Sequence, residues 1–400
     1  MRYLISRQHS RNFRFAILQR GMRGWAYLMR FPGFSAQGAD IHRMRSCVIV
    51  CGSHRSGTSA ATRLVNLLGA DIAHDLLPAS PSNSRGYWES HTILAIHNRL
   101  LQTVAASQDH PFDPTPLPID WLVTDAAREA RRQLTGAIQR EFADSRFFVV
   151  KDPRIWRLLP LWVELLQDLG IAPIVLIPFR NPLETAASLA QRDRIPLPKA
   201  LFLYFCVYLE TELASRAIPR VFVRYDHLLQ DWQLFAQRLA QIASARVSPP
   251  SKNVATEIER FLTTDLYHHR FNREQMMQHP EIPTGIVEMF DRMDETAETG
   301  DESNLRSSFD RLRANADATL RLYHGFLISE IQYLRQELMR EMSIRESFET
   351  STSWRATAPL RWLKLQVLSK LVSTHRVSLA SSRPTFQPPG ANQTRQHAAP

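Results

Sequence analysis

C-V-I-V-C-G-S-H-R-S-G-T-S-A-A-T-R, at residues 47–63, is the stretch that decides the fold. Its first five residues are apolar and three of them are β-branched, a composition typical of a buried strand. A glycine-bounded loop follows at 52–57, and a segment with the apolar spacing of a helix begins at Thr58. The pattern predicts a strand, a tight loop and a helix in direct succession.

The loop has the composition of an anion-binding site. Gly52 and Gly57 permit a tight turn with converging backbone N–H groups, and hydroxyls follow at Thr58 and Ser59, where the helix starts. The spacing of the glycines is that of a P-loop for nucleoside triphosphates, but such a loop carries a lysine directly after its second glycine. Here the cation is Arg55, inside the loop. This arrangement favours a nucleotide with a shorter anionic group at its 5′ position.

The chain continues with alternating strand-like and helix-like segments. Strands are predicted within 146–154, 173–179 and 220–225, and helices at 124–143, 199–216 and 228–246. Continuous apolar strands separated by amphipathic helices predict a parallel sheet that is covered on both faces. The predicted fold class is therefore α/β, a P-loop-like three-layer fold with a central parallel sheet and a C-terminal helical extension. Ligands of such sheets bind beyond the carboxyl ends of the strands, where most of the charged motifs fall.

Composition narrows the class of protein. The chain has 400 residues, 44% of them apolar, which is enough for a substantial core. Its net charge of +10 belongs to the two ends, because 1–46 holds nine Arg against one acid and 355–400 holds seven Lys or Arg and no acid. We therefore expect no nucleic-acid groove in the body of the protein. Three cysteines form neither an even disulfide set nor a metal-spaced cluster, so we expect reduced thiols, a cytoplasmic protein and no metal site.

Three motifs together resemble a known family. The R-S-G-T-S of the loop resembles the phosphosulfate loop of sulfotransferases that use 3′-phosphoadenosine 5′-phosphosulfate (PAPS), in the form found in carbohydrate and tyrosylprotein sulfotransferases and their bacterial relatives. Arg180, Ser188 and Arg192 resemble the motif that binds the 3′-phosphate in these enzymes. Lys151, in K-D-P, resembles the lysine near the transferring group of the tyrosylprotein enzymes. The resemblance spans roughly 46–270.

The resemblance implies a PAPS-dependent sulfotransferase, which moves a sulfuryl group from PAPS to a hydroxyl of a glycan or another acceptor. PAPS would be the co-substrate, and no metal would be needed because Arg and Lys supply positive charge. Glu89 would deprotonate the acceptor, with His91 and His97 as alternative bases, and Lys151 and Arg55 would stabilise the developing charge. The residues implied for co-substrate binding are Gly52, Arg55, Ser56, Gly57, Thr58, Ser59, Arg180, Ser188 and Arg192.

Five segments are expected along the chain. They are a basic N-terminal extension at 1–45, a sulfotransferase domain at 46–275, a linker at 276–304, a long helix at 305–348 and a basic, partly disordered tail at 349–400. The extension interleaves Arg with apolar residues, which fits a peripheral membrane contact, a transit peptide or a poorly ordered arm. No apolar run is long enough to span a bilayer, so we expect a soluble protein.

Apolar residues of the long helix recur every eleven positions, which keeps one stripe on a nearly straight helix. The three series are Phe309, Leu320, Ile331 and Met342, then Leu312, Tyr323 and Leu334, then Ala316, Leu327 and Leu338. Two interpretations fit this stripe equally well. It could hold copies of the chain together in a homo-oligomer, or it could pack on its own domain.

Two other functions are open at this point. A P-loop kinase or NTPase would use the same strand, loop and helix, although it requires the missing lysine. A non-catalytic scaffold in envelope polysaccharide assembly would use the helix with the eleven-residue repeat. The motifs leave the role of Asp152 open as well, since it could pair with Lys151 or with Arg154 and be purely structural.

Overall fold

The structure is a computed structural model that describes residues 45–360, apart from 81–82, 84, 106–113, 115–116, 244–246, 248, 264–269 and 358–359. These residues belong to two compact units, one that ends at Ala318 and one that begins at Thr319. The first unit holds the central sheet and the candidate active site. The second holds the C-terminal part of α13 (Leu305–Thr350) and α14 (Thr352–Ala356).

Four parallel strands form the sheet, in the order β2-β1-β3-β4. Their bounds are Arg45–Val50 for β1, Phe147–Lys151 for β2, Ile171–Phe179 for β3 and Arg220–Arg224 for β4. In register, Val50 lies beside Lys151 on one side and Leu176 on the other. All four strands run in the same direction, so the segments that follow them meet at one edge of the sheet. The predicted α/β class with a central parallel sheet is confirmed.

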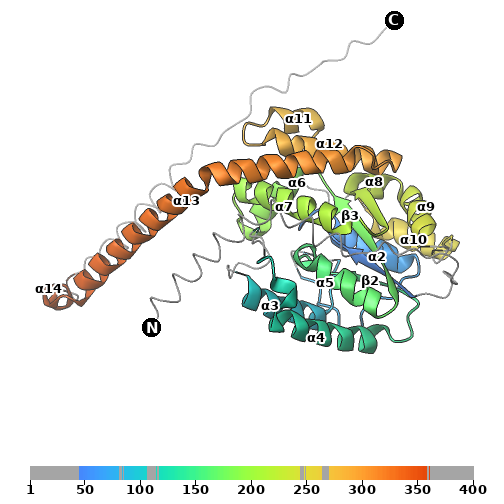
Figure 1. Ribbon diagram of the computed structural model, residues 1–400, viewed down its shortest axis with the longest axis horizontal. Coiled ribbons are helices and arrows are strands. Elements are labelled where there is room, and N and C mark those ends of the chain that lie inside the picture. The colour runs from blue at the N-terminus through green and yellow to red at the C-terminus, as the bar shows by residue number, and fades with distance from the viewer. Residues whose placement is uncertain are drawn as a thin grey trace, which may run out of the picture. The chain divides into compact units, whose positions relative to one another are not determined.

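Helices cover both faces of this sheet (Figure 1). Side chains of β1 alternate between two apolar clusters, with Cys47 and Ile49 in the first and Val48 and Val50 in the second. The first cluster includes α3 (His91–Val104), α4 (Asp125–Phe142), α5 (Ile155–Asp168), α6 (Pro182–Asp193) and α7 (Leu197–Ser215), and the second includes α2 (Thr58–Leu67), α9 (Trp232–Ile242) and α10 (Lys252–Phe261). The result is three layers, helix, sheet and helix.

Short helices complete the first unit. They are η3 (Trp121–Val123), α8 (Tyr225–Gln230) and α11 (Arg273–Gln278). Local chemistry explains where the helix after β3 begins: the side chain of Asn181 accepts a hydrogen bond from Leu183 N at 2.9 Å, and Pro182 occupies the first helical position. A rigid turn therefore follows directly on the end of β3.

The segment 276–304, expected to be a linker, is instead part of the folded unit. It forms α12 (Thr284–Thr299), which buries Met289, Phe290 and Met293. The ring of Phe290 packs edge-on against Phe179 of β3, with 5.8 Å between centroids. Apolar residues recur on one face of this helix, and such a face must be covered.

The long helix predicted at 305–348 is confirmed as α13. In the first unit its residues Phe309 and Leu312 are buried, so the stripe begins by packing on its own domain. In the second unit, two residues of the stripe whose side chains are described are exposed, Leu334 by 55% and Leu338 by 59%. Whether a second copy covers it stays a prediction.

The remaining sequence predictions concern the chain ends, the thiols and the membrane. Apart from Arg45, the basic extension lies outside the described residues, as do the residues after 360. All three cysteines, Cys47, Cys51 and Cys206, are free. Within the described part of the chain, no helix is both long and apolar enough to cross a bilayer.

The burial of α12 can be tested by truncating its core. Met289 is fully buried, whereas Met277 on α11 is 56% exposed and serves as the matched control. We expect Met289→Ala to lower the free energy of unfolding by about 2–5 kcal/mol and Met277→Ala to change it by about 0.5 kcal/mol or less. Chemical denaturation followed by circular dichroism measures both. Equal effects would mean that α12 is not part of the core.

Candidate active site

The loop between β1 and α2 is held by contacts that require glycine. A Cβ on Gly52 would lie 2.5 Å from the carbonyl oxygen of Pro178 in β3. Gly57, at φ +90°, would place a Cβ 2.3 Å from the ring of Tyr225, the first residue after β4. The hydroxyl of Ser56 is fully buried and donates to Pro178 O at 3.1 Å. The loop is thereby fixed between the ends of β3 and β4.

A cavity of about 680 Å³ lies beyond the carboxyl ends of the strands. It is bounded by the loop after β1, by Lys151 at the end of β2, by Arg180 after β3 and by Tyr225 after β4. This is the edge at which parallel sheets bind ligands. Of the predicted residues, Arg55, Gly57, Thr58, Ser59, Glu89, Lys151, Arg180 and Arg192 line the cavity, whereas Gly52, Ser56, Ser188 and His91 do not.

Three of the five arginines that line the cavity lie near one another. Arg55 comes from the loop after β1, Arg180 follows β3, and Arg192 lies near the end of α6. Ser188, although outside the lining, accepts a hydrogen bond from Arg55 Nε at 2.8 Å. Burial lowers the pKa of Arg55, and repulsion from Arg192 and Arg180 lowers it further. Positive charges that repel one another in this way are stabilised when an anion binds between them.

Carboxylates offset part of this charge. Arg180 Nε donates to Glu184 Oε2 at 2.6 Å, and Arg192 Nε donates to Asp193 Oδ2 at 2.6 Å. Glu184 also has a second partner, because its Oε1 accepts a hydrogen bond from Phe271 N at 2.8 Å. Among the described residues, these two carboxylates face three guanidinium groups, which is an excess of positive charge on this side of the cavity.

A buried ion pair lies beside the start of α2. Lys151 Nζ is 2.5 Å from Glu89 Oε1, and it is also within hydrogen-bond distance of Tyr87 O at 3.2 Å and Ser59 Oγ at 3.3 Å. Only 5% of Lys151 and 4% of Glu89 are exposed. Burial raises the pKa of Glu89, while the charge of Lys151 opposes this and that of Asp152 adds to it. Glu89 is therefore a carboxylate that accepts a proton more readily than an exposed one.

Behind this pair lies a chain of fully buried hydrogen bonds. Trp162 Nε1 donates to His97 Nε2 at 2.9 Å, so the proton of the imidazole is on Nδ1, which donates to Asp152 Oδ2 at 2.8 Å. Asp152 Oδ1 accepts from Arg154 Nη1 at 3.0 Å. Burial by itself would raise the pKa of Asp152, but the hydrogen bond from His97 and the charge of Arg154 hold it below its usual range. Asp152 thus pairs with Arg154 rather than Lys151, and both nitrogens of His97 are engaged, which removes it as an alternative base.

The sequence did not predict the aromatic wall of the cavity. The indole of Trp88 meets the ring of Phe261 edge-on at 6.2 Å, Arg63 lies over Trp88 at 4.8 Å and Arg85 lies over Phe261 at 5.5 Å. Tyr225 could have been found, because it is the last residue of the strand predicted at 220–225. Phe261 had no such signal, since it belongs to a helix far along the chain.

Comparison with known proteins finds neither a family model nor a curated protein that matches this chain.

The contact between Gly57 and Tyr225 is testable by adding one carbon. We expect Gly57→Ala to lower the free energy of unfolding more than Gly69→Ala. Both positions have positive φ, +90° and +106°, but a Cβ on Gly69 meets nothing within 4 Å. The control therefore isolates the collision from the backbone strain of about 1–3 kcal/mol that both variants share. Equal losses in denaturation experiments would show that the loop can move away from Tyr225.

Removing Lys151 should make stability depend on pH. Lys151→Met leaves Glu89 buried without its cation, a change that typically costs about 3–5 kcal/mol. The pKa of Glu89 in the folded state then rises further above the ordinary 4.5, so the unfolded state releases this proton more readily. The stability of Lys151→Met relative to the wild type is therefore highest below pH 4.5, and it falls as the pH rises towards the folded-state pKa of Glu89.

The double variant Lys151→Met/Glu89→Gln is the control, because it removes the titrating group. Denaturation curves across this pH range should show a smaller loss that no longer varies with pH. A pH-independent loss in Lys151→Met alone would contradict the interpretation of Glu89 as the titrating partner.

Proposed function

We propose that this chain is a PAPS-dependent sulfotransferase that moves a sulfuryl group to a hydroxyl of a glycan or another acceptor. The observation that carries the proposal is that one cavity contains both the guanidinium cluster of Arg55, Arg180 and Arg192 and the buried Lys151–Glu89 pair. The first is suited to hold a nucleotide with several anionic groups. In the second, Glu89 is suited to accept a proton, and Lys151 is suited to stabilise a developing negative charge.

Several donors converge for the anionic groups. The N-terminus of α2 presents Thr58 and Ser59 to the cavity, and Arg55, Arg180 and Arg192 add charged donors. Each charge-assisted hydrogen bond contributes roughly 1.5–3 kcal/mol. The cavity volume of about 680 Å³ falls in the range of about 300–1,000 Å³ that is usual for small-molecule sites. PAPS, as the donor substrate, would supply the activated sulfuryl group.

Glu89 and Lys151 divide the chemical work. As the acceptor oxygen bonds to sulfur, Glu89 takes the hydroxyl proton, which its raised pKa favours. The bond between sulfur and the bridging phosphate oxygen breaks, and negative charge develops on that oxygen. Lys151 Nζ, which is 2.5 Å from Glu89 in this structure, would leave the carboxylate and donate to that oxygen.

A second candidate is a phosphotransferase, and one observation favours it. Lys151 Nζ lies 3.3 Å from Ser59 Oγ, so a lysine from β2 approaches the start of α2, where the lysine of a P-loop would act. However, such enzymes also hold a magnesium ion with a carboxylate. Within the described part of the cavity, Glu89 and Asp193 are each paired with a cation. We therefore favour sulfuryl transfer.

Binding of nucleotides separates the two candidates. Isothermal titration of the full chain with the desulfated product PAP should give saturable one-to-one binding, and ATP with MgCl₂ should bind much more weakly. Tight ATP binding without PAP binding would overturn the proposal in favour of phosphotransfer. Binding of neither nucleotide would favour the non-catalytic scaffold.

Two variants assign the roles within the site. Arg192→Ala should weaken PAP binding about 10- to 100-fold, the equivalent of one charged hydrogen bond. Arg194→Ala, two residues further on at an exposed position outside the cavity, is the matched control and should bind normally. Glu89→Gln should bind PAP normally but lower transfer from PAPS about 100- to 10,000-fold. The mass gain of SO₃ on cell-envelope glycans reports the transfer, and lost PAP affinity in Glu89→Gln would contradict its role as the base.

A further inference from the structure

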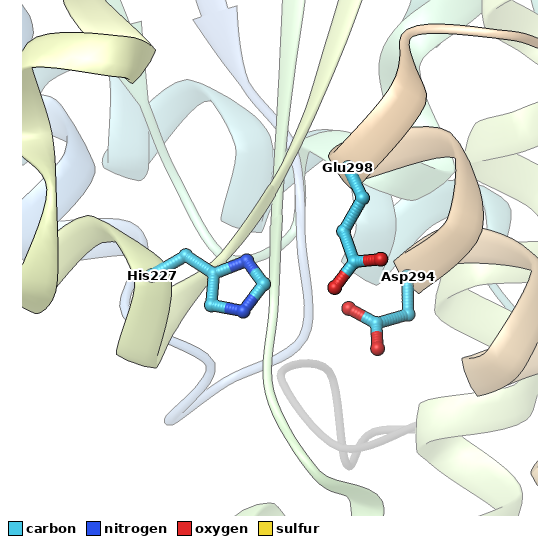
Figure 2. A group of neighbouring side chains, drawn as sticks. All are labelled: His227, Asp294 and Glu298. Atoms are coloured by element: carbon cyan, nitrogen blue, oxygen red, sulfur yellow. The ribbon is translucent and has the colours of Figure 1, made fainter.

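A second cluster of titratable side chains lies outside the cavity. His227 comes from α8, while Asp294 and Glu298 come from consecutive turns of α12. Figure 2 shows the imidazole of His227 facing both carboxylates. One potential ligand atom from each of the three residues lies within 4.8 Å of the other two. Because Asp294 and Glu298 are four residues apart, they occupy the same face of their helix.

Part of the bonding capacity of this cluster is unused in the described structure. Among the described residues, the side chains of His227 and Glu298 make no hydrogen bond and no ion pair. Asp294 Oδ2 pairs with Arg224 Nη1 at 2.5 Å, but its Oδ1 is buried and accepts no hydrogen bond within the described structure. A buried carboxylate oxygen of this kind is normally satisfied by a donor or a cation. One nitrogen and two carboxylate oxygens therefore remain available for a common ligand.

Electrostatics favours a cation at this place. α12 ends at Thr299, so Glu298 lies at the negative end of the helix dipole, and no basic residue occupies the last turn. Two carboxylates one turn apart also repel each other. Burial, together with the charge of Glu298, raises the pKa of Asp294, against the effect of Arg224.

Nearby arginines compensate for only part of this charge. Arg224 Nη1 pairs with Asp294, but its Nε pairs with Asp226 at 2.7 Å, so one guanidinium serves two carboxylates. Arg238 approaches as well, but its Nη2 donates to the main-chain oxygen of Glu298 at 2.5 Å. The side-chain carboxylate of Glu298 is left for another cation.

We propose that His227, Asp294 and Glu298 bind one divalent transition-metal ion of the Zn²⁺ type. An imidazole nitrogen combined with two carboxylates selects such ions, whereas Mg²⁺ and Ca²⁺ prefer oxygen ligands alone. Bonds of about 2.0–2.2 Å bring the ligands of a tetrahedral zinc site to about 3.3 Å from one another. Modest side-chain rotations close the cluster from its present 4.8 Å, and water completes the coordination.

This metal site would join α8 to α12. Tyr225 begins α8 and lines the cavity, while α12 packs on β4 and α7. The ion would therefore fix the short helix that follows β4. Its binding does not depend on the proposed transfer reaction, because none of its three ligands lines the cavity.

Equilibrium dialysis of the full chain with ZnCl₂, followed by metal analysis, tests the proposal. The variants His227→Gln and Glu298→Gln should each lower the affinity for one bound zinc ion about tenfold or more. Even changes to residues that only support metal ligands lower metal affinity about 10- to 100-fold. The matched control is His74→Gln, because His74 lies 3.5 Å from one carboxylate, that of Glu141, at an exposed position. It should bind zinc like the wild type. In dialysis with MgCl₂, we expect no magnesium ion at this site, so the wild type and both variants should bind the same amount of magnesium.

Thermal unfolding gives a second readout. An ion that binds only the folded chain raises Tm, so zinc should raise the Tm of the wild type and of His74→Gln more than that of His227→Gln or Glu298→Gln. Because His227 and Glu298 have no other side-chain partner in the described structure, their replacement leaves the hydrogen bonds of the fold intact. Zinc binding that is unchanged in both variants, or absent from the wild type, would overturn the proposal.

Discussion

The close approach of the β1–α2 loop to the end of β3 is the constraint on which the site depends. The carbonyl oxygen of Pro178 lies where a side chain on Gly52 would begin, and it accepts hydrogen bonds from Ser56 and from Tyr208, whose hydroxyl is 2.9 Å away. This contact joins the central strand to its neighbour and to α7. It also aims the start of α2 at the cavity. A side chain at Gly52 would separate the loop from the sheet. The loop residues would then no longer be held in place beside the other groups of the cavity.

The arginine cluster and the Lys151–Glu89 pair of the cavity differ in how their charges are balanced. Burial, together with repulsion from Arg192 and Arg180, lowers the pKa of Arg55. Among the described residues, Arg180 pairs with Glu184 and Arg192 with Asp193. Lys151 and Glu89 instead form a closed pair in a nearly dry environment. An anion entering the first region would be stabilised at once, whereas the pair must open before it can act. In the proposed function, the guanidinium groups would bind the anionic groups of the nucleotide directly, whereas the Lys151–Glu89 pair would have to separate first.

The buried chain from Trp162 through His97 to Asp152 explains how a charged turn can exist at the end of β2. An ionised Asp152 at this depth needs donors on both oxygens, which His97 and Arg154 supply. Because Trp162 occupies the other nitrogen of His97, the imidazole is restricted to one tautomer. Asp152, which directly follows Lys151, is thereby bonded through both carboxylate oxygens. Such a network is valuable only when complete, since each missing partner would leave a buried polar group unsatisfied.

Local patterns in the sequence determined the strands, several of the helices and the position of the glycine-bounded loop, because apolar spacing and glycine content act over a few residues. They also indicated which strand ends carry charge. Tertiary structure alone decided that Glu89 meets Lys151, that Phe261 closes the cavity wall and that α12 is part of the core. It alone brought His227 next to Glu298. Contacts between residues so far apart along the chain leave no local signature, since they depend on how the layers pack and not on the identity of neighbouring residues.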